Sequence, residues 1–372
     1  MNRIFSYLTP LALAACAASG AANASELGDS MPRALYTQTN AVGGNEILVY
    51  TRYDDRLILS SRVATRGTGT DGGLGNQGAL VLSENGRRLY AVNAGSNDVS
   101  VFAVRGGGAL SLLQRLPSGG TRPVSLALHD SVLYALNAGD IGNVSGFSVA
   151  DDGRLQAIPG ATRPLSAAAV GPAQVEFNNH GDVLVVTEKA TNKISVYAVE
   201  DGVARGPFVR DSKGMTPFGF AFDKRDHLIV SEAFGGAAGA SALSSYDLDD
   251  ADGPLELISG SVPDAQSAAC WVVVTRNSRY AYTSNTASGN VSGYRVSRHG
   301  ALSLLTRGGV TGDVGPGSGP TDLVLSPNSR MLASLNPPIG TIQLFAVRSD
   351  GGLVRGDTLQ GVPASATGLV AR

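Results

Sequence analysis

A short β-hairpin motif repeats along this chain, and the repeat restricts the possible folds more than any other feature of the sequence. In its clearest copy, the apolar stretch 89–93 (Leu-Tyr-Ala-Val-Asn) is followed by a polar turn and by the alternating stretch 99–104. Two further clear copies begin with residues 133–137 and 281–285. Weaker copies begin with residues 35–39, 184–188, 228–232 and 332–336. Seven such hairpins predict a repeat fold, because one unit cannot bury its apolar face alone.

The spacing of the copies fits the blades of a propeller. Successive hairpins begin about 44 to 54 residues apart, and a blade of four short strands needs about 40 to 50 residues. Each unit also has an inner strand before the hairpin, such as 79–82, and an outer strand after it, such as 110–113. The first unit lacks its inner strand, whereas residues 367–372 resemble an inner strand that no hairpin follows. We therefore predict an all-β, seven-bladed β-propeller over residues 35–372, whose C-terminal strand completes the N-terminal blade and closes the ring.

The first residues indicate export. Arg3 precedes an apolar run at residues 4–18, and a small-x-small pattern follows at residues 22–24. This arrangement predicts a signal peptide over residues 1–24 and a mature leader over residues 25–34. The expected location is therefore periplasmic or secreted.

A lipid anchor is the alternative to cleavage after residue 24. Residues 13–16 (Leu-Ala-Ala-Cys) resemble the bacterial lipobox, which would place a lipid on Cys16. Cys270 is the only other cysteine, so no intramolecular disulfide is expected once Cys16 is removed or lipidated. The apolar neighbours of Cys270 favour a buried structural thiol. No apolar run in the sequence is long enough to span a bilayer.

The charge balance excludes several classes of partner. The chain has 29 basic and 31 acidic residues and a net charge of -2, which gives no electrostatic reason to bind nucleic acid or an anionic membrane. The glycines at 106–108 follow one strand and open another, so they indicate a turn rather than a phosphate-binding loop. We expect a monomer without a cofactor.

The strand order predicts which residues gather at one mouth of the central channel. The end of each second strand and the start of the next inner strand lie on the same face, where propellers bind their ligands. The residues that end the second strands are Thr39, Asn93, Asn137, Glu188, Glu232, Asn285 and Asn336. The polar or aromatic residues at the starts of the inner strands are Arg122, Gln174, Phe218, Trp271 and Asp322. These five are the predicted substrate-binding residues.

Glu188 and Glu232 depart from the Asn that most blades carry at this position. They could be two solvated carboxylates on turns, or a catalytic pair that acts as general acid and base. With nearby Asn oxygens they could also bind Ca²⁺, which takes six to eight oxygen ligands. A reaction at the mouth would have no histidine, because all four fall in turns of the opposite face. They are His129, His180, His227 and His299.

The repeats resemble the seven-bladed lactonase family of bacterial 6-phosphogluconolactonases and carboxymuconate cyclases. The resemblance covers roughly residues 35–372 and is carried by residues 89–93, by 192–197 (Asn-Lys-Ile-Ser-Val-Tyr) and by 319–327 (Gly-Pro-Thr-Asp-Leu-Val-Leu-Ser-Pro). It implies the opening or closing of a lactone ring without a metal, by His, Arg and Glu at the mouth.

The match to the family's functional residues is partial. Glu232 corresponds to the family's Glu, but one family His falls on Ala173, and the family's Arg-His pair falls on Phe218 and Gly219. Without the His and Arg, a shared mechanism would be slower by several orders of magnitude. Phosphorylated sugars are cytoplasmic, so an exported chain is expected to use a different lactone.

Two functions therefore stay open. The first is an exported lactonase-like enzyme that hydrolyses or forms a lactone of a sugar acid or another carboxylated small molecule, with Glu232 and Glu188 as the catalytic residues. The second is a non-catalytic propeller that binds a small molecule at the mouth or a partner protein in the periplasm. The fold cannot decide between them, because propellers serve many unrelated functions.

Overall fold

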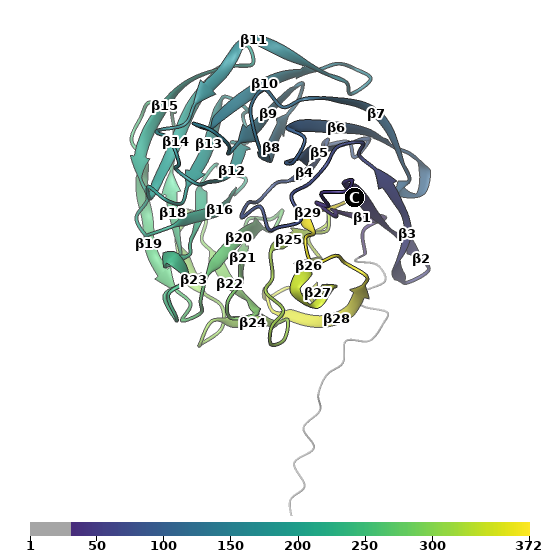
Figure 1. The fold of residues 1–372 in the computed structure, drawn as a ribbon. Coiled ribbons are helices and arrows are strands. Elements are labelled where there is room, and N and C mark those ends of the chain that lie inside the picture. The colour runs from purple at the N-terminus through teal and green to yellow at the C-terminus, as the bar shows by residue number, and fades with distance from the viewer. Residues whose placement is uncertain (1–30) are drawn as a thin grey trace, which may run out of the picture.

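The repeated apolar stretches form the strands of seven sheets, which a computed structural model describes over residues 31–372. Each sheet is one blade, and the blades form a ring around a central axis (Figure 1). Within a blade the strands are antiparallel neighbours, and in six of the blades they follow one another in chain order from the axis outward. The predicted seven-bladed β-propeller is confirmed.

The first blade combines the two ends of the described chain. Its strands, from the axis outward, are β29 (Thr367–Ala371), β1 (Ala34–Gln38), β2 (Glu46–Tyr53) and β3 (Arg56–Ala64). β29 pairs with β1 along its length, and the backbone N–H of Arg33 donates to the carbonyl oxygen of Arg372 at 2.6 Å. The C-terminal strand therefore closes the ring, as the sequence predicted. The predicted signal peptide and most of the leader, residues 1–30, lie outside the described residues.

The next three blades have four strands each. The second blade contains β4 (Leu80–Leu82), β5 (Arg88–Asn93), β6 (Asp98–Val104) and β7 (Leu110–Pro117). The third contains β8 (Pro123–His129), β9 (Val132–Asn137), β10 (Asn143–Val149) and β11 (Leu155–Pro164). The fourth contains β12 (Pro172–Phe177), β13 (Val183–Glu188), β14 (Lys193–Glu200) and β15 (Val203–Asp211).

The last three blades follow the same plan, except that the outer edge of the sixth is split. The fifth contains β16 (Pro217–Phe222), β17 (Leu228–Glu232), β18 (Ala242–Asp247) and β19 (Glu256–Pro263). The sixth contains β20 (Ala269–Val274), β21 (Tyr280–Asn285) and β22 (Asn290–Val296), and β22 pairs with both β23 (Leu302–Leu304) and β24 (Val310–Asp313). The seventh contains β25 (Asp322–Leu325), β26 (Met331–Asn336), β27 (Thr341–Val347) and β28 (Leu353–Gln360). Three single-turn 3-10 helices are η1 (Gly106–Gly108), η2 (Phe234–Gly236) and η3 (Pro337–Ile339).

The second strand of each blade carries the core. Every residue of β13 and of β26 is buried, because neighbouring blades cover both faces of a middle strand. Such a strand is apolar along its length instead of alternating, which explains the continuous apolar runs of the repeat. The outer strand β3 is mostly exposed, and every residue of β19 is exposed or half-buried.

A tyrosine in the second strand links each of four blades to the next blade. These tyrosines are completely buried, and they are Tyr36, Tyr90, Tyr134 and Tyr282. Each hydroxyl group donates, over 2.8 to 3.1 Å, to the carbonyl oxygen of a glycine in an outer turn of the next blade, namely Gly108, Gly153, Gly202 and Gly351, respectively. The four glycines have φ values between 76° and 90°, a region that residues with a Cβ rarely adopt.

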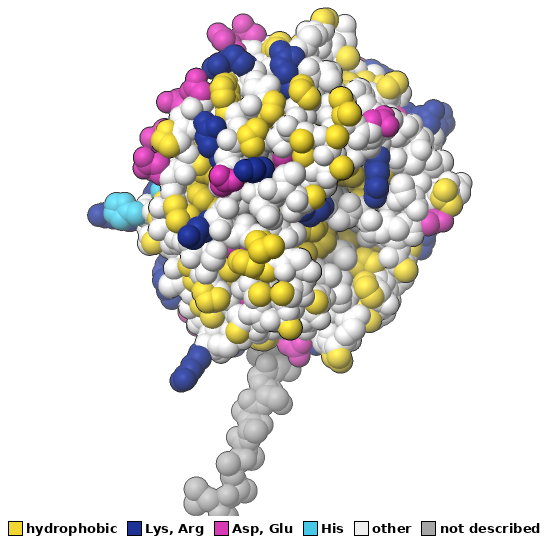
Figure 2. Space-filling view, turned by 60° about the vertical axis from the view of Figure 1, so that its left-hand side comes forward, with side chains coloured by type: hydrophobic (Ala, Val, Ile, Leu, Met, Phe, Trp, Pro, Cys, Tyr) yellow, Lys and Arg dark blue, Asp and Glu magenta, His cyan; other side chains and the backbone are white. Residues whose placement is uncertain are grey.

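The charged side chains are spread over the surface. On the face shown in Figure 2, basic and acidic side chains alternate among uncharged ones, in keeping with the net charge of -2. Within residues 31–372, no helix has the length and apolar character needed to cross a bilayer.

We expect the loss of a blade-linking hydroxyl group to destabilise the ring in proportion to the hydrogen bonds it makes. Tyr282→Phe removes one bond, whereas Tyr134→Phe removes two, because Tyr134 also accepts from the N–H of Ala204 at 2.8 Å. At about 1 kcal/mol for each buried hydrogen bond, the free energy of unfolding should fall by about 1 and about 2 kcal/mol. Denaturant unfolding measures both values. Tyr53→Phe is the control, because Tyr53 is 67% exposed. Equal losses in the two buried variants would contradict the prediction.

Candidate functional site

We call the face on which the second strands end the upper face, and we call the channel opening on that face the mouth. Glu188 and Glu232 end β13 and β17 there, as predicted. Both side chains are completely buried. They do not open to the solvent of the mouth, which the sequence did not indicate.

Hydrogen-bond donors surround the carboxylate of Glu188. It accepts from the backbone N–H of Ser166 at 3.0 Å, from the hydroxyl group of Ser195 at 2.7 Å and from that of Thr191 at 3.2 Å. The Ser166 hydroxyl group also donates to it. Four hydrogen bonds to an ionised carboxylate compensate for its burial.

The carboxylate of Glu232 is enclosed in the same way. It accepts from the backbone N–H of Gly214 at 2.8 Å, from the hydroxyl group of Ser261 at 2.7 Å and from the hydroxyl group of Ser244. Gly214 packs so closely that a Cβ at that position would lie 2.1 Å from a carboxylate oxygen of Glu232.

In two of the blades with Asn at this position, those of Asn93 and Asn285, the bond to the serine of the third strand has donor and acceptor exchanged. Asn93 donates to the hydroxyl group of Ser100 at 2.8 Å and to the carboxylate of Asp98 at 2.6 Å. The equivalent serines of the two Glu blades donate instead. The acceptor at the Asp98 position is replaced in those blades by Lys193 and Ala242. In the two Glu blades, the change from Asn to Glu is therefore accompanied by changes in the residues that bond to this position. The catalytic role of each Glu stays a prediction, and it requires the hydrogen-bond donors around the carboxylate to move away.

Lys189 is the mouth residue that the sequence analysis missed. Its ammonium group donates to the carbonyl oxygens of Gly75 and Pro172 and lies 4.7 Å from the centroid of the Phe218 ring. The Phe218 ring packs against that of Trp271, with centroids 5.1 Å apart. The structure thus brings two predicted substrate-binding residues together and adds a cation beside them.

Two cationic side chains, Lys189 and Arg122, belong to the mouth. The pKa of Lys189 is lowered to about 8, mainly because burial removes water from its ammonium group. The positive charge of Arg122 also lowers this pKa, whereas Cys270 raises it. Arg122 is exposed. The indole N–H of Trp271 is buried and has no hydrogen-bond partner among residues 31–372. Two cations and an unused N–H suit a ligand that carries a carboxylate.

The other two predicted binding residues have structural contacts. Gln174 links two inner strands, because its amide accepts from the N–H of Phe220 at 2.7 Å and donates to the Phe220 carbonyl oxygen at 3.0 Å. Asp322 is 3% exposed and accepts from the N–H of Leu323 at 2.8 Å. Burial raises the pKa of Asp322 well above its ordinary value. Neither side chain lies open at the mouth.

Residues 74–78 lie across the mouth. The side chain of Gln77 accepts from the N–H of Val272 at 3.0 Å and donates to the Val272 carbonyl oxygen at 2.8 Å. In Figure 1 the segment before β4 reaches across the centre of the ring toward β16 and β20. The connection between β3 and β4, residues 65–79, is the longest between two blades. Its length is the sequence signal that could have indicated this segment.

Both positions at which the family would have a histidine border Gln77. The backbone N–H of Gln77 donates to the carbonyl oxygen of Ala173 at 3.0 Å. A Cβ on Gly219 would lie 2.2 Å from the amide oxygen of Gln77. A histidine at the position of Gly219 could not coexist with Gln77 as it stands here.

His129 is the last residue of β8, whereas the sequence analysis placed it in the following turn. His180, His227 and His299 lie between strands and Cys270 near the start of β20, as predicted. His129 lines a cavity of the opposite face, and His227 is bonded to Asp223 at 3.0 Å just before β17. Cys270 is free and buried, and burial raises the pKa of its thiol to about 11. Within residues 31–372, no group of three His, Cys, Asp or Glu side chains is arranged to hold a metal.

Comparisons with known proteins agree with the observed fold. A family model described as "Lactonase, 7-bladed beta-propeller" matches residues 44–161. A proposed 6-phosphogluconolactonase from Bacteroides fragilis is 17% identical, with a TM-score of 0.69, over 91% of this chain and 98% of that chain. The periplasmic gluconolactonase of Pseudomonas aeruginosa is 17% identical, with a TM-score of 0.69, over 91% and 99%. A protein from Lactobacillus plantarum is 16% identical, with a TM-score of 0.72, over 91% and 99%.

The chain is thus a seven-bladed β-propeller. The resemblance to the lactonase family is confirmed over residues 44–161, which lie in the first three blades. No curated protein sequence matches the chain. At 16 to 17% identity, the solved structures show the fold and not the activity.

We expect Glu232→Gln to destabilise the fifth blade, because an amide nitrogen cannot accept from the donors that face it. A hydrogen bond to a charged group contributes about 1.5 to 3 kcal/mol, so the free energy of unfolding should fall by about 2 kcal/mol. Denaturant unfolding measures the loss. Glu46→Gln is the control, since Glu46 forms only an exposed ion pair with Arg62, at 3.7 Å, and such pairs add little stability. A Glu232→Gln variant as stable as the control would contradict the structural role.

Proposed function

We propose that this chain is an exported lactonase-like propeller that hydrolyses or forms the lactone of a sugar acid or another carboxylated small molecule at the mouth. The main support for this proposal is the position of Lys189, whose ammonium group lies over the Phe218 ring. The charge of Arg122 is close enough to lower the pKa of Lys189. The cations would bind the carboxylate of the ligand. The packed rings of Phe218 and Trp271 would cover its apolar side.

The family resemblance and the start of the sequence support the rest of this proposal. The match to the lactonase family over residues 44–161 favours lactone chemistry. A protein of the same fold from Pseudomonas aeruginosa is named a periplasmic gluconolactonase, which favours gluconolactone as a first substrate to test. The predicted signal peptide, residues 1–24, favours the periplasm. An anchor on Cys16 is the alternative, and the mass of the mature chain distinguishes the two.

The reaction needs water and a proton carrier. Water would add to the carbonyl carbon of the lactone, the bond from that carbon to the ring oxygen would break, and the ring oxygen would take a proton; ring formation is the reverse. Glu232 and Glu188 are the proposed acid and base. Since Glu232 is enclosed by Ser244 and Ser261, these hydroxyl groups would have to turn away in the reacting state.

A non-catalytic binding function is the second candidate, and the enclosure of both carboxylates favours it. Gln77 also fills the space beside Ala173 and Gly219, where the family would have histidines. In this alternative the mouth would hold a carboxylated small molecule or an acidic segment of a periplasmic protein without changing it.

Turnover assays on the mature chain separate the two candidates. We expect gluconolactone to be hydrolysed faster than it is without protein, and Glu232→Gln to abolish the acceleration. For a lactone that keeps a free carboxylate, Lys189→Gln should raise KM about tenfold with little change in kcat, because it removes a contact made equally in the ground state and the transition state.

Gluconate and muconate serve as ligands in a parallel thermal-shift experiment, because a bound ligand stabilises the native state. Stabilisation by these acids without turnover of any lactone would support the binding function and refute the enzyme. The absence of both effects would refute a small-molecule site at the mouth.

We further expect gluconate affinity to fall as the pH rises through about 8. The pKa of Lys189 is about 8, so its ammonium group loses its charge there, while the ligand carboxylate stays ionised. Bound gluconate favours the charged ammonium, so the decrease should begin near pH 8, the pKa of Lys189 in the free protein, and level off above the higher pKa that Lys189 has in the complex. Isothermal titration calorimetry from pH 6 to 10 measures it. Lys189→Arg keeps its charge throughout, and its affinity should stay constant. The same decrease in this variant would contradict the role of Lys189.

A further inference from the structure

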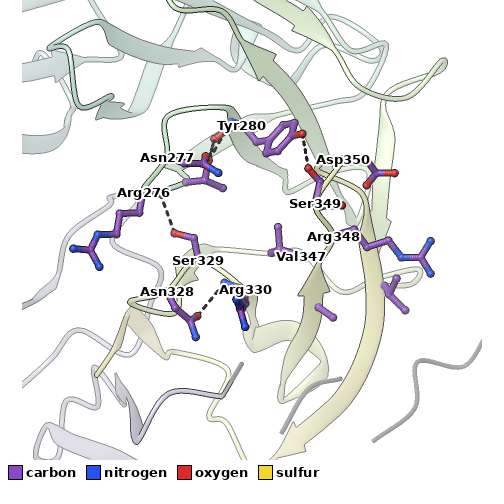
Figure 3. Close-up of a pocket in the computed structure, with 13 residues that line it drawn as sticks. Arg276, Asn277, Tyr280, Asn328, Ser329, Arg330, Val347, Arg348, Ser349 and Asp350 are labelled. Carbon is purple, nitrogen blue, oxygen red and sulfur yellow. Dashed lines mark hydrogen bonds between the residues drawn. The ribbon is translucent and has the colours of Figure 1, made fainter. Parts of the chain in front are cut away.

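A cleft between the sixth and seventh blades opens on the lower face, opposite the mouth. It has a volume of about 850 Å³, which is in the range of small-molecule sites. Figure 3 shows that its walls come from the turns before β21 and β26 and from the turn after β27. The residues that determine its chemistry are Arg276, Asn277, Tyr280, Asn328, Arg330 and Arg348.

The arginines of this cleft have no acidic partners. Arg276, Arg330 and Arg348 are exposed, and none forms an ion pair within residues 31–372. Asp350 is the one carboxylate among the lining residues, and one of its oxygens accepts from the N–H of Gly352. The cleft is therefore a positive site on a chain whose net charge is -2.

Two further arginines add to this charge. The guanidinium groups of Arg279 and Arg295 lie 5.6 and 5.5 Å from the centroid of the Tyr280 ring. The Tyr280 hydroxyl group donates to the carbonyl oxygen of Ser349 at 2.8 Å, so this contact fixes the ring in the wall of the cleft.

The neutral side chains of the cleft offer donors. The oxygen of the Asn277 amide accepts from the backbone N–H of Arg279 at 3.0 Å and from the hydroxyl group of Thr275 at 2.8 Å. The oxygen of the Asn328 amide is used in the same way within its own turn. A backbone N–H can only donate, so these bonds fix the amide orientations. Each Asn is left with its NH₂ group for a ligand.

A second cavity on the lower face has the opposite character. It has a volume of about 750 Å³ and is lined by Glu84, Asp130 and Glu176. An anion would be repelled there.

We propose that this cleft is a second binding site, separate from the mouth, for a small multivalent oxyanion. Guanidinium groups pair with carboxylate and phosphate oxygens through two parallel hydrogen bonds. Three turns supply such groups, and the Asn amides add N–H donors between them. In Figure 3 the side chains of Arg276 and Arg348 extend away from the cleft on opposite sides, so both would turn inward to meet a ligand. A phosphate ester or a polycarboxylate has the required charge, whereas a sugar acid with a single carboxylate does not.

Calorimetry on the mature chain tests this proposal with tripolyphosphate, citrate and gluconate as probes. We expect tripolyphosphate or citrate to bind, and gluconate to bind at the cleft at least about tenfold more weakly. The double variant Arg330→Gln/Arg348→Gln should weaken binding of the multivalent probe about tenfold or more, because charge-assisted hydrogen bonds are lost. Both side chains are exposed, so the fold should be kept, and denaturant unfolding checks this.

Arg105→Gln is the matched control. Arg105 directly follows the third strand of the second blade, as Arg348 follows the third strand of the seventh, and its variant should bind the probe like the unchanged chain. Lys189→Gln should also leave this binding unchanged. Binding of tripolyphosphate but not citrate would identify a phosphate site, and the reverse a polycarboxylate site. The proposal would be overturned if neither tripolyphosphate nor citrate bound, or if the double variant bound the probe as tightly as the unchanged chain. It would also be overturned if the Lys189→Gln variant lost this binding.

Discussion

Each blade of this ring has two apolar faces that only its neighbours can cover, and the whole structure depends on that constraint. A single blade would expose the middle strands, such as β13 and β26, whose residues are all buried in the ring. The hydrophobic effect therefore favours a closed ring over any open array. The bond from a tyrosine hydroxyl group to a glycine carbonyl oxygen in the next blade fixes how neighbouring blades meet. The pairing of β29 with β1 removes the last open edge.

The upper face shows how one position can carry different residues without a change in architecture. At the end of the second strand, Asn93 and Asn285 donate to a serine of the third strand, and each Glu accepts from the equivalent serine. A buried carboxylate needs several donors, and Glu188 and Glu232 have them. This exchange explains why the Glu pair stands out in the sequence even before any catalytic role is considered. Burial and hydrogen bonding together make these carboxylates part of the framework of the mouth.

The mouth itself is shaped by a segment that belongs to another blade. Residues 74–78 cross the ring, and Gln77 bonds to Val272 next to Gly219, which has no Cβ to obstruct it. Lys189 reaches the same segment through the carbonyl oxygen of Gly75. The mouth therefore combines a cation, an aromatic pair and an enclosed Glu, which differs from the His, Arg and Glu that the family resemblance implies. A ligand at this mouth would meet positive charge first.

The sequence by itself determined the all-β class, the number of blades, the closure by the last strand and the face on which each hairpin ends. These features follow from local rules, because strand periodicity and turn residues act over a few positions and recur in every copy. Only the tertiary structure decided that Gln77 fills the mouth, that Lys189 lies over Phe218, and that arginines from three turns come together at one cleft. Such contacts join residues up to 195 positions apart. They depend on how the blades pack around the axis, which no local pattern in the chain records.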